Sequence, residues 1–149
     1  MIIRRAVAAD IAPAAALMAR AYATHFQPII GDAAPDFDQA HFEARFAREL
    51  AELTVLDADG VCGALLVKEG HIAMLFAAEP GQGHGAALLA HAEAHGAHSL
   101  EVFAANEGAR RFYERAGWQV ARDYEREFAG ALHRFLRYEK PMIPARRQG

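Results

Sequence analysis

The sequence predicts an α/β (α+β) fold built on a mixed, mostly antiparallel sheet of about six or seven strands flanked by about four helices. Residues 71–94 read as an apolar strand, a glycine loop and a helix, and such a unit normally leads into a parallel strand. Two further patterns indicate hairpins, which are antiparallel: β-rich runs flank the Asp59-Gly60 turn, and two more such runs close the chain. The three patterns together predict a mixed sheet.

The first half of the chain is expected to form a strand, a helix, a loop and a second helix. Residues 2–7 predict a short strand, and Asp10 is placed to cap a helix that runs to about residue 23. Proline and glycine residues interrupt the helical pattern between residues 24 and 38, which predicts a loop able to line a pocket. Apolar residues at helical spacing then predict a helix over residues 38–50.

The second half is expected to alternate strands and helices. A hairpin over residues 53–67 leads into a strand at residues 72–78, which carries no charge and is therefore expected to be buried on both faces. Gly96 and Gly117 are placed to end two helices. The elements predicted after the glycine loop are a helix over residues 85–95, a strand over 99–103, a helix over 107–116, and strands over 118–128 and 132–138.

Length and composition are those of a soluble globular protein. The 149 residues suffice for one domain, expected to span residues 1–149 with a flexible tail at 141–149. The chain is 53% hydrophobic and 23% charged with a net charge of −3, so it lacks a basic excess, and no nucleic-acid partner is expected. No apolar stretch reaches the ~20 residues of a membrane span and no signal-peptide pattern opens the chain, which predicts a cytoplasmic protein without a membrane partner. Cys62, the only cysteine, is expected to fill the core.

Three glycines occupy alternate positions in the loop between the strand and the helix. Gly81, Gly83 and Gly85 let the backbone approach a ligand closely, and a helix that begins there presents unpaired N–H groups at the positive end of its dipole. Both features suit a phosphate or a pyrophosphate. The alternative is an ordinary tight turn.

Two polar side chains follow the next strand. Asn106 comes shortly after the strand at residues 99–103, at the edge of the sheet where open α/β proteins bind ligands, and Tyr113 lies further along the helix that follows. Taken alone, Asn106 is more often a helix cap and Tyr113 more often a packing residue.

Residues 100–118, LEVFAANEGARRFYERAGW, resemble the second motif of the GNAT superfamily of N-acetyltransferases, and the order of predicted elements is similar along nearly the whole chain. The opening, Ile3 to Ala6 followed by Asp10, also resembles that of the family. The glycine loop resembles the family's pyrophosphate motif in either of two registers. One runs from Gln82 to Ala87, and the other takes residues 83–85 as the final glycines and places Pro80 where glutamine or arginine is expected.

The resemblance implies an acetyltransferase that uses acetyl-CoA as co-substrate. Its fold would have a central V-shaped opening between the strands that end at Ala78 and Phe103, and its acceptor would be an amine of a small molecule or peptide, attacking directly in a ternary complex. Tyr113 resembles the general acid that protonates the departing thiolate, and Asn106 the side chain that anchors the pantetheine arm. The implied cofactor-binding residues are Leu75, Phe76, Ala77, Gln82, Gly83, His84, Gly85, Ala86, Ala87, Asn106, Ala109, Phe112 and Tyr113. The protein would be a monomer or a homodimer.

Several alternatives stay open. The general base could be Glu79, Glu101, His25 or His71, or a water relay could replace it. The serious functional rival is a non-catalytic module that keeps the fold to bind acyl-CoA or a protein partner.

A metal site is not expected. The chain has eight histidines, and His84, His91 and His95 could share one helix face. The helix of a zinc protease requires a glutamate directly after the first histidine of a five-residue motif. In residues 91–95, Glu93 is instead the third residue. A dinucleotide site is also disfavoured. Gly81, Gly83 and Ala86 have the glycine spacing of a Rossmann-like loop, but no acidic residue ends the next strand, as such a site requires.

The sequence does not identify the acceptor molecule. Three aromatic residues suggest an apolar wall and three acidic residues a rim that would suit a cationic amine, although ordinary loop anchors fit equally well. These residues are Tyr22, Phe26, Phe37, Asp32, Asp36 and Asp38.

Overall fold

The computed structural model describes residues 1–31 and 36–141. The chain divides into two compact units, Met1–Ala97 and His98–Gly149. That these units form one domain stays a prediction, and residues 142–149 of the predicted tail lie outside the described residues.

Four antiparallel strands form the sheet of the first unit. They are β1 (Ile2–Arg5), β2 (Leu53–Asp57), β3 (Val61–Lys68) and β4 (His71–Ala77), each paired with the next in the chain. The predicted Asp-Gly turn joins β2 to β3, with positive φ values of 60° at Asp59 and 115° at Gly60. Asp57 Oδ1 accepts a hydrogen bond from the Gly60 N–H at 3.0 Å. The predicted hairpin is confirmed.

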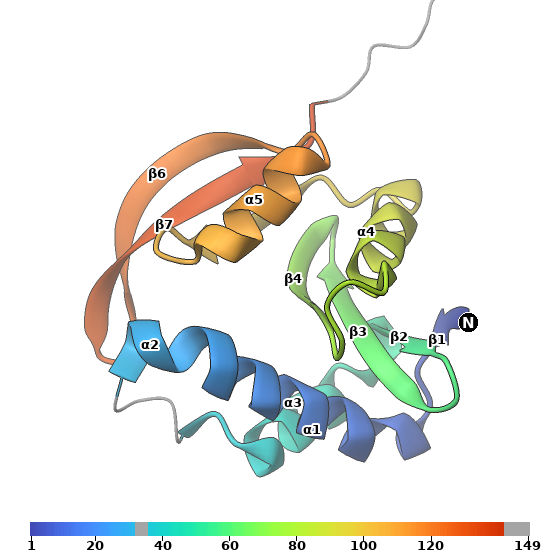
Figure 1. The fold of residues 1–149 in the computed structure, drawn as a ribbon. Helices are drawn as coiled ribbons and strands as arrows, with labels where there is room; N and C mark the ends of the chain where they lie inside the picture. Colours follow the sequence, from blue (N-terminus) through green and yellow to red (C-terminus); the bar gives the residue numbers. More distant parts are fainter. Residues whose placement is uncertain (32–35, 142–149) are drawn as a thin grey trace, which may run out of the picture. The chain divides into compact units, whose positions relative to one another are not determined.

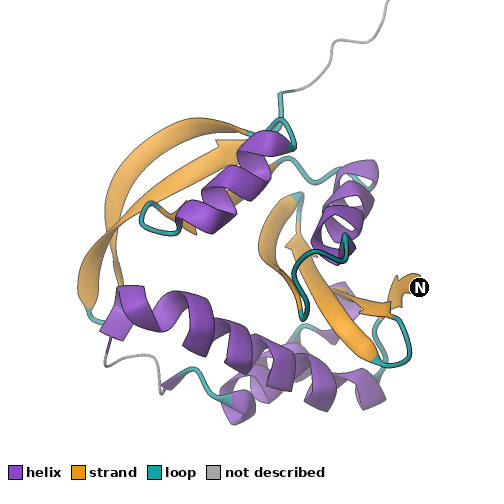
Figure 2. Cartoon of the chain, viewed as in Figure 1, coloured by secondary structure: helices purple, strands orange, loops and turns teal. Residues whose placement is uncertain are grey.

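Helices cover both faces of this sheet. Helices α1 (Ile11–Ala21) and α3 (Gln39–Arg48) lie side by side against one face, and α4 (His84–Ala94) packs on β3 and β4 (Figure 1). Figure 2 shows the same layers by secondary structure. The core under α1 and α3 consists of Ala14, Ala15, Leu17, Met18, Phe42, Phe46, Leu53, Val55, Ala64, Leu66, Met74 and Phe76.

Gly63 allows α4 to approach the sheet. A Cβ atom on Gly63 would lie 2.9 Å from Leu88 Cδ1 and 3.2 Å from the Phe76 carbonyl oxygen, so the leucine side chain would have to shift and the contact with the carbonyl would be tighter than most. A strand glycine often marks such a close approach. Because α4 begins at the glycine loop, this contact also helps to position the loop.

The loop predicted between residues 24 and 38 is wrong over its first part, because the helix continues there. A π-helical turn, η2 (Tyr22–Phe26), follows α1 and leads into the short helix α2 (Gln27–Ile30). Pro28 lies in the first turn of α2, a position at which proline is tolerated. The helix ends at Gly31, whose φ is 61°, and residues 32–35 lie outside the described residues.

The sequence predicted that β4 would be buried on both faces, and this prediction is wrong. Ile72, Met74 and Phe76 are buried, whereas the residues between them are half-buried. The half-buried residues are His71, Ala73, Leu75 and Ala77, most of them apolar, so the charge-free run did not distinguish the two faces.

Three antiparallel strands and one helix form the second unit. The strands β5 (Ser99–Phe103), β6 (Gln119–Phe128) and β7 (Ala131–Glu139) lie in the order β5-β7-β6. Residues 129 and 130 join β6 to β7 with positive φ values of 53° and 85°, as a two-residue hairpin turn requires. Helix α5 (Glu107–Arg115) packs on this sheet through Tyr113, whose ring lies 6.3 Å from that of Tyr138 (Figure 1). These elements match the predicted ones.

Asp10 does not cap α1 with its side chain, because an ion pair holds the carboxylate instead. Arg4 donates two hydrogen bonds to it, at 2.8 and 3.0 Å, and the Val7 N–H donates a third at 2.8 Å. The bond from Arg4, aided by that from Val7, holds the pKa of Asp10 below its usual range although burial opposes the shift.

Acid should therefore weaken the first unit through Asp10. Because the folded-state pKa is lowered, this stabilisation is fully present above the ordinary aspartate pKa of about 4 and is lost as the pH falls through the folded-state value. Asp10→Asn should lower the free energy of unfolding at pH 7 by about 1–3 kcal/mol and flatten its decline with acid. Urea denaturation over a pH series measures both. Asp59→Asn, on the exposed β2–β3 turn, should retain the native decline, and an equally steep decline in Asp10→Asn would contradict the assignment.

Candidate active site

The glycine loop of the first unit ends in an uncapped helix N-terminus. Gly83 is the N-cap of α4 with φ 78°, and Gly81 has φ 83°. The first helical hydrogen bond runs from the Ala87 N–H to the Gly83 carbonyl at 3.0 Å, which leaves the N–H groups of residues 84–86 outside the helical ladder. No side chain caps them. The positive end of the helix dipole is therefore available to an anion.

The backbone around this terminus has room for a ligand. A Cβ atom on Gly81 or Gly83 would meet no atom within 4 Å. Leu88 and Leu89 are buried, as the register that places the final glycines at residues 83–85 requires, while Gln82 is exposed in the loop. Both registers use the same backbone, and the choice between them stays a prediction.

The two units hold different parts of the predicted site. In the first unit, Leu75, Phe76 and Ala77 lie on β4, Gln82 and Gly83 in the loop, and His84, Gly85, Ala86 and Ala87 in the first turn of α4. In the second unit, Asn106 precedes α5, and Ala109, Phe112 and Tyr113 lie on it. A V-shaped opening would take one strand from each unit, so the opening and a joint site stay predictions.

Asn106 caps α5. Its Oδ1 atom accepts a hydrogen bond from the Ala109 N–H at 3.2 Å, as the simpler interpretation of the sequence had it. The cap occupies the Ala109 N–H, so Ala109 can contact a cofactor only through other atoms. The side-chain amide N–H groups of Asn106 have no hydrogen-bond acceptor within residues 1–31 and 36–141, and they can still donate to a ligand.

Tyr113 is buried with only 7% of its surface exposed. Its ring packs against Phe112 and Trp118, with centroids 5.0 and 6.2 Å away. Burial raises the pKa of the Tyr113 hydroxyl above its usual value, so the hydroxyl keeps its proton at neutral pH but is a weaker acid than free tyrosine. The part of the chain that the structure describes offers this hydroxyl no hydrogen bond.

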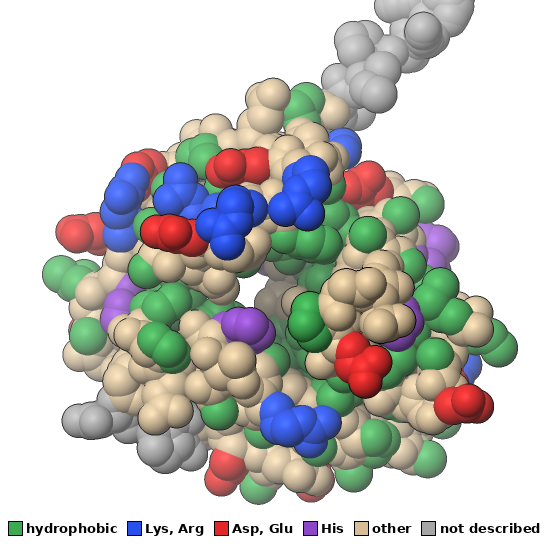
Figure 3. Space-filling model, viewed as in Figure 1, with side chains coloured by type: hydrophobic (Ala, Val, Ile, Leu, Met, Phe, Trp, Pro, Cys, Tyr) green, Lys and Arg blue, Asp and Glu red, His purple; other side chains and the backbone are tan. Residues whose placement is uncertain are grey.

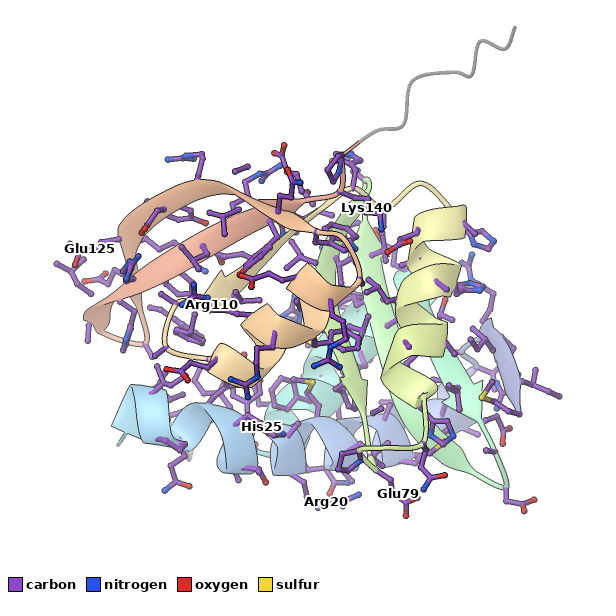
Figure 4. All side chains as sticks on the ribbon, turned by 45° about the horizontal axis from the view of Figure 1, so that its top comes forward. Arg20, His25, Glu79, Arg110, Glu125 and Lys140 are labelled. Carbon is purple, nitrogen blue, oxygen red and sulfur yellow. The ribbon has the colours of Figure 1, made fainter. Side chains whose placement is uncertain are left out.

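Two of the candidates for the general base are poorly suited to the task. Glu101 accepts hydrogen bonds from Arg126, at 2.9 Å to Nε, and from Tyr124, so its carboxylate is already engaged. His71 begins β4, whereas Ala77, one of the implied cofactor-binding residues, ends it. About 20 Å of extended strand therefore separates His71 from that end of the predicted site. Glu79, on the loop after β4, and His25, on η2, are exposed (Figure 4).

The predicted acceptor wall is a packed aromatic cluster. Tyr22 lies 4.4 Å from Phe26 and 5.0 Å from Phe37 between ring centroids. In the predicted acidic rim, Asp38 serves as the N-cap of α3 and accepts from the His41 N–H at 2.9 Å. Asp36 is exposed, and Asp32 lies outside the described residues.

One contact beside the glycine loop was not foreseen. Cys62, expected to be core filler, is half-buried on β3 with its Sγ atom 3.7 Å from His84 Nδ1. The two residues are 22 apart in sequence, so no local pattern could have indicated the pair. Only the packing of α4 on β3 brings them together.

Neither metal ligation by a cluster nor membrane spanning is supported in the described ranges. Within residues 1–31 and 36–141, no group of three or more histidine, cysteine or acidic side chains could hold a metal ion. No helix in these ranges is both long and apolar enough to cross a membrane.

Comparison with known proteins identifies related folds. A family model described as "Acetyltransferase (GNAT) domain" matches residues 29–140. The solution structure of apo YjaB from Escherichia coli superposes with a TM-score of 0.74 and 22% identity, covering 93% of this chain and 97% of that one. A GCN5-related N-acetyltransferase from Rhodopseudomonas palustris gives a TM-score of 0.71 and 22% identity, covering 95% of both chains. Naa50 from Arabidopsis thaliana, in complex with the bisubstrate analogue CoA-Ac-MVNAL, gives 0.54 and 21%, covering 65% of this chain and 79% of that one. No curated protein sequence matches the chain.

Proposed function

The chain belongs to the GNAT family of acetyltransferases, and on that premise we propose that it transfers an acetyl group from acetyl-CoA to an amine of a small molecule or peptide. The observation that carries this proposal is the N-terminus of α4. Its free N–H groups, with a positive-φ glycine at the N-cap and open space above it, suit the pyrophosphate of CoA.

The thioester of acetyl-CoA supplies an activated acetyl group and a thiol as leaving group. The loop backbone from residues 82 to 87 would hold the pyrophosphate, and a backbone N–H of residues 75–77 on β4 would stabilise the negative charge that develops on the carbonyl oxygen. Tyr113 would donate its proton to the departing sulfur. Holding the amine and the thioester together supplies much of the acceleration in a direct attack within a ternary complex.

The acceptor is proposed only as a class. The Arabidopsis Naa50 structure contains a bisubstrate analogue that joins CoA to a peptide, which makes a peptide amine a reasonable first acceptor to assay. Asp36 is exposed and directly precedes Phe37 of the aromatic cluster, and its charge would favour a cationic substrate. A screen of small amines and peptide N-termini with acetyl-CoA would decide between a small-molecule acceptor and a peptide acceptor.

One observation favours the alternative, a non-catalytic module that binds acyl-CoA or a partner. Burial makes Tyr113 a weaker acid than free tyrosine. CoA binding without turnover on any amine in the screen would support this alternative over the enzyme. The single-domain organisation, the cytoplasmic location, the monomeric or dimeric state and the lack of a nucleic-acid partner stay predictions.

Titration of the full chain with CoA should show saturable binding and a rise in Tm, since a ligand that binds only the folded state stabilises it by mass action. Calorimetry and thermal denaturation measure the two effects. Pantetheine, which lacks the pyrophosphate, is the matched control and should bind far more weakly. Equal binding of both ligands would place the pyrophosphate elsewhere, and no CoA binding at millimolar concentration would remove the cofactor assignment.

A further inference from the structure

We propose that His91, in the last turn of α4, and His95, the C-cap residue directly after the helix, form a surface site for a divalent transition-metal ion such as Cu²⁺, Ni²⁺ or Zn²⁺. The two residues are four apart, the spacing that places two imidazoles on one side of a helix and that helical zinc sites use. The site is independent of acetyl transfer.

The two rings already lie beside each other. Their centroids are 4.2 Å apart with an interplanar angle of 27°. Two imidazole nitrogens that share a tetrahedral ion at about 2.0–2.1 Å lie about 3 Å from each other, with both in-plane lone pairs directed at the ion. The stacked rings must therefore rotate about their side-chain bonds to chelate an ion, and their proximity keeps both within reach of it. His91 is half-buried and His95 is exposed, which leaves the remaining coordination positions to water. Figure 3 shows histidine side chains at the surface over α4.

The hydrogen bonding of His95 selects the nitrogen that can bind a metal. Its Nδ1 atom lies 2.8 Å from the His91 carbonyl oxygen. A carbonyl only accepts, so Nδ1 must carry the hydrogen, and the lone pair of the neutral ring is on Nε2. An Nδ1–H bond to a backbone carbonyl is the arrangement that commonly orients metal-ligating histidines.

His91 is also suited to ligation. Within the described part of the chain, neither of its ring nitrogens has a hydrogen-bond partner. The site also lies at the negative end of the α4 dipole, which favours a cation.

The site differs from a catalytic zinc helix. Glu93 lies two residues from each histidine and so does not share their helix face. No general base faces the ion from this pentapeptide, so we infer binding without hydrolysis. Cu²⁺ should bind most tightly of the three ions, following the general order of divalent-metal affinities.

The test is a titration of the full chain, free of any affinity tag, with Cu²⁺ in the absence of CoA. Calorimetry should show one saturable site, and the electron paramagnetic resonance spectrum should show coupling to two imidazole nitrogens. His91→Gln and His95→Gln should each weaken binding by about tenfold or more and reduce the coupling to one nitrogen. Gln retains good helix propensity, so circular dichroism should stay native.

His98→Gln, at an exposed histidine near this pair in sequence, is the matched control and should bind Cu²⁺ like the native chain. Unchanged affinity and two-nitrogen coupling in His91→Gln and His95→Gln would place the ion at other histidines and overturn the proposal. Absence of a saturable site in the native chain would overturn it as well.

Discussion

Tyr113→Phe should lower kcat by about 10²-fold while CoA affinity stays within a few-fold. The change removes a proton donor and keeps the ring that packs against Phe112 and Trp118. Because no described residue bonds the hydroxyl, its removal leaves no partner unsatisfied, and the free energy of unfolding should change by less than about 1 kcal/mol. Steady-state kinetics with an acceptor from the amine screen, together with CoA calorimetry, measure the two effects.

The pH profile adds a second readout for Tyr113. Burial raises its pKa, so the group stays protonated through the ordinary tyrosine range, and the native kcat should show no loss near pH 10 from its ionisation. Tyr138→Phe is the matched control, since Tyr138 is also buried in this unit but donates its hydrogen bond to Glu114 at 2.6 Å. Equal rate losses in both variants would indicate a packing effect. Full activity in Tyr113→Phe would show that water or another group supplies the proton.

Gly83→Leu should weaken CoA binding by roughly 100-fold. A side chain at the N-cap of α4 would fill the open space in which the pyrophosphate is proposed to lie, and losing two charge-assisted hydrogen bonds of about 1.5 kcal/mol each corresponds to that factor. The φ of 78° also strains any residue with a Cβ, at a cost of about 1–2 kcal/mol in stability.

Gly96→Leu separates the strain from the loss of the site. Gly96 has φ 92° and equally open surroundings, but it follows the other end of α4. Both variants should lose similar stability in urea denaturation, whereas only Gly83→Leu should lose CoA affinity in calorimetry. Normal CoA binding by Gly83→Leu would mean that the pyrophosphate does not contact this terminus.

Local signals in the sequence predicted most of the elements. The Asp59-Gly60 and Ala129-Gly130 turns require positive φ at residues that tolerate it, and both hairpins formed as expected. Gly83 and Asn106 mark helix starts, which depend on the residues of a single turn. The family resemblance, carried by residues 100–118, rests on the same local order of residues and is confirmed by the family match.

Segments governed by competing local signals were predicted less well. Pro28 and Gly31 indicated a loop from residue 24 onward, yet the helix absorbs Pro28 in a first turn and ends only at Gly31. The apolar run of β4 indicated burial on both faces, but burial depends on which neighbours cover each face, and small residues such as Ala73 fit a half-covered face as well.

The sequence by itself determined the order of the strands and of helices α1, α3, α4 and α5, the glycine loop that begins α4, and the positions of Asn106 and Tyr113 around α5. Only the tertiary structure decided what their side chains do. Asp10 pairs with Arg4 instead of capping a helix, and Cys62 lies against His84. Tyr113 is buried deeply enough to raise its pKa. Each of these outcomes depends on desolvation or on a partner from another element, and such distances are fixed by packing and not by local sequence.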